Sequence, residues 1–240
     1  MKIGIVTMGT GRYADFLDFN LSSFHKYFFP QYERQFVRLT DKKYDPPVES
    51  IVLNFPHYDW PFPTLYKPKA ILSTKPYMID CDIIFWIDVD LLCIDNVTDV
   101  ASVFPTKDRP ICCVEHCGWL DKDGNEIVLY PYELNPKSKA YVKDIYKVPY
   151  HQACLFGGLN YEFYKMISIL DHNIDEDLKN DLIAVWYDES HLNKYFQNLL
   201  PKSIPKIYAR PEAMGELLPN TKIKSIMKPN LNIEYRKNNQ

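Results

Sequence analysis

The opening of the chain passes from one hydrophobic pattern to another. Residues 2–7 form a short apolar run, and Gly9 and Gly11 supply a turn after it. From Tyr13 to Pro30, apolar side chains recur at steps of three and four residues, which predicts an amphipathic helix. Its apolar positions are Phe16, Leu17, Leu21, Phe24, Tyr27 and Phe28. A strand, a glycine turn and a helix in this order are typical of the first βα unit of an α/β domain.

Further apolar runs predict the other strands of a sheet. The run 83–87 is apolar throughout, which favours a central strand covered on both faces. Other strands are expected at 35–40, 49–55, 111–114 and near 204–208. Helices are expected at 69–78, 161–171, 176–185 and 189–199, an irregular stretch at 60–68, and a long loop at 117–150. Long ordered loops in compact domains are usually functional.

Length and composition fit one folded domain. The chain has 240 residues, of which 46% are hydrophobic and 25% charged, so we expect a single α/β domain with a real core. The 18 tyrosines and 13 phenylalanines suit core packing and sugar stacking. A net charge of -3 gives no sign of the basic surface that nucleic-acid binding requires, so no nucleic-acid partner is expected. Only the segment 222–237 is locally basic, which suits a small anion such as a diphosphate.

No segment predicts secretion or membrane insertion. The N-terminal apolar run is too short for a signal peptide and no apolar run reaches about 18 residues, so we expect a soluble, cytoplasmic protein without an integral membrane segment. Six cysteines lie mostly in apolar stretches without a paired C-x-x-C spacing, at positions 81, 93, 112, 113, 117 and 154. This usage is typical of buried thiols in a reducing cytoplasm, and zinc fits it poorly.

Two carboxylates follow the most apolar strand. Asp88 and Asp90 stand at the carboxyl end of the run 83–87, the edge where open α/β sheets bind ligands. Two acids there can share one divalent cation with phosphate oxygens and water, and such a metal neutralises a leaving diphosphate. Alternatively, both aspartates only end the strand and begin a turn. The preceding Phe-Trp-Ile favours the metal site, because acids delivered by a buried strand need a compensating cation or ready water.

A second acidic pair stands at the start of a predicted helix. If that helix begins at Asp188 or Glu189, both acids lie at the inner end of its buried face, which contains Leu192, Tyr195, Phe196 and Leu199. A helix N-terminus favours ionised carboxylates, so the position suits a nucleophile or charge stabiliser at an oxocarbenium-like centre. Asp188 is equally explained as an N-cap assisted by Ser190, whereas capping does not explain Glu189. Trp186 suits either the core or sugar stacking.

These motifs together resemble a known family. The run Ala-Val-Trp-Tyr-Asp-Glu-Ser-His-Leu-Asn-Lys-Tyr at 184–195 closely resembles the signature of glycosyltransferase family 6, which includes the ABO blood-group transferases, α-1,3-galactosyltransferases and shorter bacterial relatives. Weaker matches are Gly-Arg-Tyr-Ala-Asp-Phe-Leu at 11–17, Ile-Asp-Val-Asp at 87–90, Val-Glu-His at 114–116 and the glycine turn Leu-Phe-Gly-Gly at 155–158. The resemblance spans about residues 3–230 and fits a short bacterial- or phage-type member.

The resemblance implies a fold and a reaction. The implied fold is of GT-A type, a Rossmann-like mixed sheet flanked by helices in one domain over 1–240. A nucleotide-binding half is expected at about 1–90. An acceptor-binding, catalytic half with a basic C-terminal tail is expected at about 91–240. The reaction is transfer of a hexose from a UDP-sugar donor to an oligosaccharide or glycolipid acceptor. The resemblance further implies Mn²⁺ as cofactor, retention of configuration and an α-1,3 linkage.

The resemblance also assigns roles to single residues. Asp88 and Asp90 would hold the metal, and Glu189 would be the catalytic nucleophile or stabiliser at the anomeric carbon. The donor-binding residues would be Thr7, Met8, Tyr13, Lys67, Asp88, Val89, Asp90, Gln152, Ala153, Cys154, Asp188, Lys228 and Arg236. The acceptor-binding residues would be His116, Trp186, Asp188 and Glu189.

Several positions depart from the family pattern. Many bacterial members resemble the family with asparagines in place of the two aspartates and work without metal, so the aspartates of this chain favour Mn²⁺. Lys67 stands where the family has an arginine, and the spacing of Lys228 and Arg236 differs from the mammalian tail. The segment Gln152 to Cys154 matches none of the familiar donor-selecting combinations. Because cysteine is bulkier than glycine or alanine, this segment favours galactose over N-acetylgalactosamine.

Two other functions fit the same residues. One is a catalytically silent protein that binds nucleotide sugars, which would bind UDP without transfer or slow donor hydrolysis. The other is a GT-A glycosyltransferase with inverting chemistry and a catalytic base, which the configuration of the product separates from a retaining enzyme. A nucleotidyltransferase also uses Asp-x-Asp and metal, but the sequence has no glycine-rich phosphate loop with a lysine.

Overall fold

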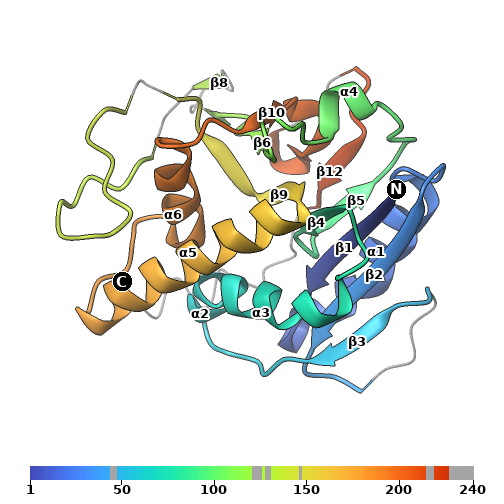
Figure 1. The fold of residues 1–240 in the computed structure, drawn as a ribbon, viewed down its shortest axis with the longest axis horizontal. Helices are drawn as coiled ribbons and strands as arrows, with labels where there is room; N and C mark the ends of the chain where they lie inside the picture. Colours follow the sequence, from blue (N-terminus) through green and yellow to red (C-terminus); the bar gives the residue numbers. More distant parts are fainter. Residues whose placement is uncertain (44–47, 121–125, 128–130, 146–147, 215–218, 227–240) are drawn as a thin grey trace.

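A seven-stranded sheet runs through the protein in the computed structural model, which describes residues 1–43, 48–120, 126–127, 131–145, 148–214 and 219–226 (Figure 1). Its strands, in spatial order, are β10 (Lys202–Ile204), β6 (Ile111–Glu115), β9 (His151–Leu159), β4 (Ile83–Ile87), β1 (Lys2–Met8), β2 (Glu33–Thr40) and β3 (Ile51–Asn54). Only β9 runs antiparallel to its neighbours, β4 and β6, while the other pairs are parallel. The sheet is therefore mixed.

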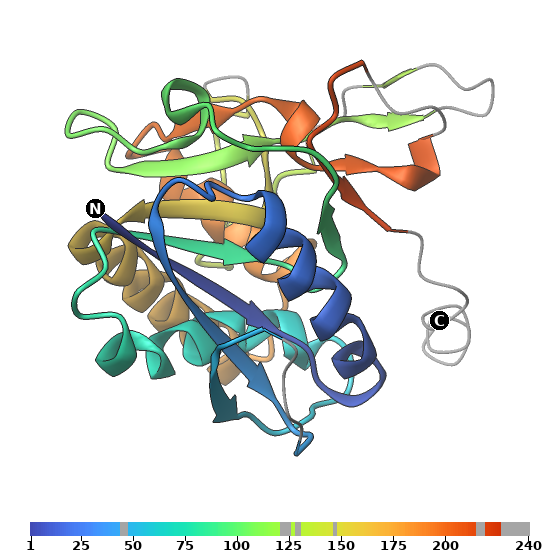
Figure 2. The ribbon, with the colours of Figure 1, turned by 90° about the vertical axis from the view of Figure 1, so that its right-hand side faces the viewer.

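Helices cover both faces of this sheet (Figure 2). One face packs against α1 (Leu17–Tyr27), and the other packs against α3 (Lys67–Ser73), α5 (Asn160–Lys179) and α6 (Tyr187–Phe196). Short helices are α2 (Phe62–Leu65) and α4 (Val100–Val103), with 3-10 turns η1 (Gly11–Phe16), η2 (Lys75–Tyr77), η3 (Lys206–Tyr208) and η4 (Glu212–Met214). The prediction of a single α/β domain with a mixed sheet between helices is confirmed.

Small accessory sheets extend from the main one. A three-stranded sheet joins β5 (Leu91–Cys93), β12 (Ile223–Ser225) and β11 (Arg210–Pro211), and a two-stranded sheet joins β7 (Trp119–Leu120) and β8 (Glu126–Ile127). Because β12 pairs with β5, the end of the described chain lies beside the residues that follow β4. Within the described ranges, no helix is long and apolar enough to cross a membrane.

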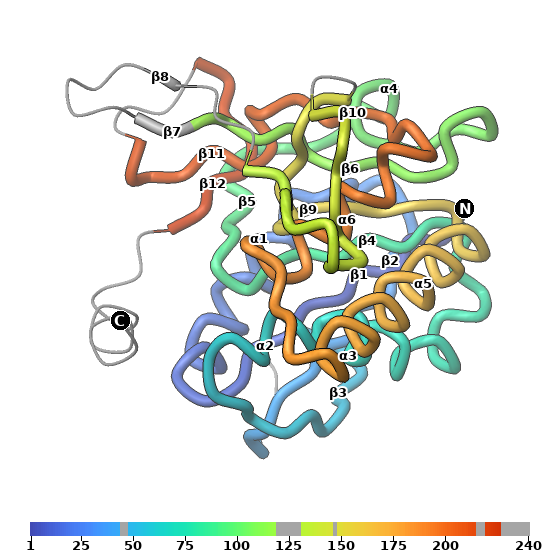
Figure 3. Tube along the Cα trace, turned by 90° about the vertical axis from the view of Figure 1, so that its left-hand side faces the viewer, coloured from blue at the N-terminus to red at the C-terminus, as the bar shows by residue number. Residues whose placement is uncertain are grey.

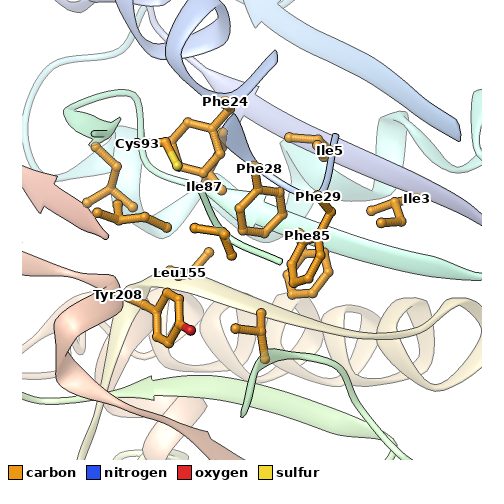
Figure 4. Close-up of a cluster of buried hydrophobic side chains, with 14 of the residues drawn as sticks. Ile3, Ile5, Phe24, Phe28, Phe29, Phe85, Ile87, Cys93, Leu155 and Tyr208 are labelled. Carbon is orange, nitrogen blue, oxygen red and sulfur yellow. The ribbon is translucent and has the colours of Figure 1, made fainter. Parts of the chain in front are cut away.

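Strand β4 lies between two hydrophobic clusters. Its side chains alternate, with Phe85 facing the α1 side and Trp86 facing the α3 and α5 side. Figure 4 shows Phe85 among Phe24, Phe28 and Phe29. Burial of one such aromatic side chain contributes about 1.5–3 kcal/mol. The fully apolar run that predicted a central strand is thereby explained, because both faces of β4 are covered.

Several predicted elements differ from the structure. The expected helices at 161–171 and 176–185 are one helix, α5, since Ile174 continues its buried face; it ends at Lys179, before Asp181 takes a φ of 55°. Two further elements shift: residues expected to be irregular at 60–68 include α2 and the start of α3, and the strand expected near 204–208 is β10 followed by a 3-10 turn. The helix expected to run to residue 199 ends at Phe196.

The expected glycine turn at 155–158 is also wrong, because these residues lie inside β9. A Cβ atom at Gly157 would lie 2.5 Å from Cδ1 of Phe85 and 2.6 Å from the carbonyl oxygen of Ile84. A Cβ atom at Gly158 would lie 2.6 Å from Cδ1 of Ile111. The glycines therefore allow close approach within the sheet rather than a turn.

The cysteine prediction agrees with the structure. All six thiols are free, and five of them are buried. Burial raises the pKa of Cys112 to about 12 and that of Cys93 to about 12, so these thiols stay protonated at neutral pH.

Candidate active site

The two aspartates after β4 stand in a turn that neighbouring elements hold. The backbone N–H of Asp88 donates to the carbonyl of Cys154 (2.8 Å), which ties the turn to β9. Asn20 of α1 donates through Nδ2 to the carbonyls of Asp88 (3.1 Å) and Leu91 (2.8 Å). Asp90 is buried, with its Oδ2 3.5 Å from the hydroxyl of Ser225 in β12. The turn is therefore fixed from three sides.

Lys67 joins this turn to the start of α6. It is buried at the start of α3, and its Nζ lies 2.8 Å from Oδ2 of Asp188 and 3.1 Å from Oδ1 of Asp88. The same ammonium donates to the carbonyl of Ala153 (3.0 Å) and lies 5.5 Å from the centre of the Trp86 ring. Burial alone would lower the pKa of Lys67, but the carboxylates of Asp188 and Asp88 outweigh burial and raise it. Lys67 therefore remains a cation at the centre of three structural elements.

The start of α6 shows whether Asp188 caps the helix. The helix begins at Tyr187, and its N-cap is Trp186, without a side-chain cap hydrogen bond. The backbone N–H of Trp186 donates to the hydroxyl of Ser190 (2.9 Å), so that residue supports the helix start as expected. Asp188 lies inside the first turn with its side chain on Lys67. The N-cap alternative for Asp188 is therefore wrong.

Glu189 faces the edge of β9. Its Oε2 accepts the backbone N–H of Ala153 (2.9 Å), and the residue is only partly buried. Burial of the carboxyl group and repulsion from Asp188 raise the pKa of Glu189 to about 7, although the Ala153 hydrogen bond opposes the rise. A carboxyl group with this pKa is divided between its two forms near neutral pH.

Asp88 and Asp188 thus share one buried cation, Lys67. Burial and the nearby charges of Asp90 and Asp188 raise the pKa of Asp88 to about 6, against the opposing influence of Lys67 and a 2.7 Å hydrogen bond from Nε1 of Trp86. Burial also raises the pKa of Asp188. The cluster is therefore short of positive charge, which is the electrostatic condition for holding a further cation.

The segment from Gln152 to Cys154 lies in β9 between the acids. Both backbone groups of Ala153 are used, since its N–H binds Glu189 and its carbonyl accepts from Lys67. Gln152 donates through Nε2 to the carbonyl of Glu115 (3.3 Å), and its Oε1 accepts from the thiol of Cys154 (3.4 Å). The segment therefore lies beside the acidic cluster, and Ala153 acts through its backbone.

The predicted nucleotide-binding residues lie at the same edge of the sheet. Thr7 and Met8 end β1, which runs parallel to β4, and Tyr13 follows in η1. Thr7 is fully buried, and its hydroxyl has no hydrogen-bond partner in the described part of the chain. The side chain of Val89 is buried, so a contact to a donor would involve its backbone. Parallel strands bring these residues to the carboxyl edge as expected.

The predicted acceptor side lies across β6 and α6. His116 follows β6, and its Nδ1 accepts the backbone N–H of Gly118 (3.0 Å). Burial lowers the pKa of His116 to about 4, so its imidazole is neutral at physiological pH. Its ring contacts that of Tyr150, with centroids 5.6 Å apart. Trp186 is half-buried directly before the acids of α6.

The long loop is anchored beside α5 and α6. The segment 131–145 passes these helices (Figure 3), where Oε2 of Glu133 accepts the backbone N–H of Val185 (2.7 Å). Asp177 accepts from the hydroxyl of Ser138 and from the backbone N–H of Lys139. The loop therefore supports the connection between α5 and α6 that carries Trp186.

Some residues of the site were not identified from the sequence, and two residues that were identified lie outside the described ranges. Asn20 occupies a position on the apolar face of α1, and a polar residue at such a position is a usable sequence signal. Tyr150 was also missed: its side chain interacts with the carboxyl group of Glu189, and the sequence carries no signal for this. The basic-tail residues Lys228 and Arg236 lie outside the described residues.

A cavity of about 480 Å³ lies elsewhere, at the amino ends of β1 and β2. Lys2 and Arg34 line it together with Glu33 and Glu49, so its charges are mixed. Arg34 donates to backbone carbonyls at the end of α1, including that of His25 (2.7 Å). This cavity is separate from the acidic cluster. The chemistry of the residues in the acidic cluster favours that cluster as the active site.

The chain is similar to known glycosyltransferases. A family model described as glycosyltransferase family 6 matches residues 70–224. The O-antigen biosynthesis glycosyltransferase WbnI of Escherichia coli is 27% identical over 219 residues, which cover 90% of this chain and 91% of that protein. The globoside alpha-1,3-N-acetylgalactosaminyltransferase 1 of Gallus gallus is 24% identical over 85% of this chain and 60% of its own length.

A third relative, the histo-blood group ABO system transferase 2 of Rattus norvegicus, is 25% identical over 80% of this chain and 58% of its own length. The chain therefore spans nearly the whole bacterial relative and about three fifths of these two vertebrate relatives. The acids after β4 and at the start of α6 lie within the range that the family model matches, whereas Lys67 lies just before it.

Proposed function

Because the chain belongs to glycosyltransferase family 6, we propose that it transfers a hexose from a UDP-sugar to a glycan acceptor at the acidic cluster. One observation carries this proposal. Lys67 draws Asp88 and Asp188 together beside Glu189, at the carboxyl edge of the sheet. The residues expected at the donor and the residues expected at the anomeric carbon therefore meet in one place.

The proposed reaction assigns separate tasks to the acids. Glu189 has a carboxylate that is held by one backbone N–H and is partly exposed, as a group facing a cationic anomeric centre requires. The ion pair with Lys67 holds Asp188 in place beside it and opposes the rise in the pKa of Asp188 that burial causes. Glu189 serves either as nucleophile or as stabiliser of the oxocarbenium-like centre, and retention of configuration is compatible with both.

Asp88 and Asp90 fit a divalent cation such as Mn²⁺. Oδ1 of Asp88 is engaged by Trp86 and Lys67, and Oδ2 has no hydrogen-bond partner among the described residues. Burial and the charges of Asp90 and Asp188 raise the pKa of Asp88, and a cation bound there would favour its ionised form. The described ranges hold no cluster of three or more His, Cys, Asp or Glu side chains for a metal, so the diphosphate and water would complete its coordination. When bound, the metal supplies charge neutralisation for the leaving diphosphate.

For the donor sugar, we favour galactose over N-acetylgalactosamine. Cys154 stands in β9 at the register where its carbonyl meets the Asp88 N–H, so its side chain occupies space beside the acids. The thiol is bulkier than the hydrogen or methyl group of glycine or alanine. An α-1,3 linkage is proposed by analogy with the name of the Gallus gallus relative.

The test is a donor-hydrolysis and transfer screen of UDP-sugars, with and without Mn²⁺. We expect slow hydrolysis of UDP-galactose that depends on Mn²⁺ and becomes transfer when a sugar acceptor is added. Saturable UDP binding without hydrolysis or transfer of any donor would instead show a silent nucleotide-sugar binding protein. Coupling constants of the product then distinguish a retaining from an inverting enzyme.

A further inference from the structure

The side chain of Tyr150 lies close enough to Glu189, the proposed catalytic acid, for each to affect the pKa of the other. The residue precedes β9 and is 2% exposed. Its hydroxyl is buried and makes no hydrogen bond with good geometry among the described residues. The nearby carboxylate of Glu189 adds to the effect of burial and raises the pKa of Tyr150, so the phenol is a protonated donor throughout the working pH range. A buried donor without a partner costs free energy unless it gains one during function.

The ring of Tyr150 is fixed in this position. It makes edge-to-face contacts with His116 (5.6 Å between centroids) and with Tyr132 (5.1 Å). The backbone carbonyl of Tyr150 also accepts the N–H of His116 (2.9 Å). Contacts on two sides restrict the motion of the ring, which keeps the hydroxyl in its place. Tyr150 therefore contacts the acceptor-side histidine and also lies near Glu189.

Glu189 has one anchored oxygen and needs a second donor to be fully oriented. The backbone N–H of Ala153 holds Oε2 at 2.9 Å. Ala153 lies near the start of β9 and Tyr150 directly precedes that strand, so a second bond from Tyr150 would fix the carboxylate against one segment of the chain. A carboxylate that must face a reacting carbon gains from such preorganisation.

We propose that Tyr150 is a positioning residue for the reaction, whose hydroxyl donates to the Glu189 carboxylate and fixes its direction when the donor is bound. This inference rests on the proposed function, in which Glu189 faces the anomeric carbon. Tyr150 touches neither sugar nor nucleotide in this role and acts only through Glu189.

The test is Tyr150→Phe, which removes the hydroxyl and keeps the ring contacts. We expect kcat to fall about ten- to a hundredfold, the range for a lost hydrogen bond to a charged group, while the KM for the UDP-sugar changes less than about twofold. Loss of a buried hydroxyl without a partner should leave the melting temperature near that of wild type. Tyr132→Phe is the matched control, because it removes a hydroxyl from the same aromatic cluster. The hydroxyl of Tyr132 donates to the carbonyl of Val148 (2.7 Å) and not to Glu189. The control should keep wild-type kcat.

A second readout separates positioning from a general packing effect. The hydrogen bond stabilises the ionised form of Glu189, so Tyr150→Phe should move the acid limb of the kcat profile to higher pH. The other ionisable groups that influence Glu189 or are influenced by it, Asp188, Lys67, Cys113 and Cys154, are unchanged in this variant. In a Glu189→Gln background, the additional change Tyr150→Phe should lower the residual rate less than about twofold, because the two residues act as a unit.

The outcomes distinguish this inference from the proposed function. If wild type transfers sugar and Glu189→Gln does not, while Tyr150→Phe keeps wild-type kcat and pH profile, the inference fails and the proposed function stands. If the loss caused by Tyr150→Phe is equally large in the Glu189→Gln background, Tyr150 does not act through Glu189. If wild type neither hydrolyses nor transfers any UDP-sugar, the proposed function itself fails.

Discussion

The ammonium nitrogen of Lys67 lies 2.8 Å from Oδ2 of Asp188, across 121 residues of sequence, and the two side chains are 8% and 9% exposed. This ion pair joins α3 to α6, and its lysine also reaches Asp88 after β4. A buried charge is tolerated only when it is paired and hydrogen-bonded. Lys67 therefore links the acidic turn after β4 to the acids at the start of α6.

Replacement of that lysine tests its importance for stability. Lys67→Met leaves the carboxylates of Asp188 and Asp88 without their cation, so we expect the free energy of unfolding to fall by about 3–5 kcal/mol. Lys69→Met is the control two residues away, because Lys69 pairs with Asp175 at a site where both side chains are more than one third exposed. Exposed pairs contribute less than about 1 kcal/mol. Equal urea midpoints for the two variants would contradict the role of Lys67.

Replacement of Glu189 should change both kcat and the dependence of kcat on pH. Glu189→Gln should lower kcat about a thousandfold with UDP affinity largely kept, because the substitution removes charge that matters only in the transition state. The pKa of Glu189 is about 7, so its ionised fraction and kcat should rise as the pH increases from 6 to 8. The variant should lose this limb. Glu162→Gln, at a carboxylate paired with Lys165 on α5, is the control and should keep the wild-type profile. A Glu189→Gln enzyme with near-normal turnover would remove Glu189 from the reaction.

The proposed metal site predicts a chelator effect. Transfer should stop in excess chelator and return with Mn²⁺, and Asp88→Asn and Asp90→Asn should each weaken this rescue. Mn²⁺ together with UDP should also raise the melting temperature of wild type, and less so that of either variant. Asp95→Asn is the control, because Asp95 follows β5 and pairs with Lys222, which directly precedes β12. Undiminished activity in chelator would mean that the two aspartates only hold the turn and bind Lys67.

Gly157 tests the close approach inside the sheet. An alanine there would place a Cβ atom 2.5 Å from Cδ1 of Phe85, so β4 and β9 would have to separate or Phe85 would have to shift. We expect a loss of about 1–3 kcal/mol in the free energy of unfolding, measured by urea denaturation, the usual cost of overpacking. Replacement of Ala153 by glycine removes a methyl group from the same strand without a clash and is the control. An unchanged midpoint for Gly157→Ala would show that the sheet adapts without cost.

The sequence alone predicted those features of the site whose residues are neighbours along the chain. An apolar run followed by Asp88 and Asp90 predicted a central strand and an acidic turn, because burial on both faces removes polar residues from such a strand. The run around Asp188 and Glu189 predicted a helix start with acids in its first turn. Both motifs also carried the resemblance to the family. The roles assigned to single donor and acceptor residues, and the division of the chain near residue 90, stay predictions.

Local pattern failed where distant segments decide the outcome. Gly157 and Gly158 look like a turn in sequence, yet they are strand residues because Phe85 and Ile111 need the space that a side chain would fill. The polar residues after Asp171 look like a break between helices, yet Ile174 is buried by neighbouring elements and α5 continues. Propensity is a weak prior, and tertiary packing overrides it.

The sequence by itself determined which acids this protein has and which strand and helix carry them. Only the tertiary structure decided that Lys67 pairs with Asp188 rather than with solvent, that Ala153 uses its backbone to hold Glu189, and that Tyr150 lies near the same carboxylate. The physical reason is that hydrogen bonds and ion pairs depend on distances of about 3 Å. Such distances are set by the packing of α3, α6 and β9 against one sheet, and the order of residues along the chain does not contain them.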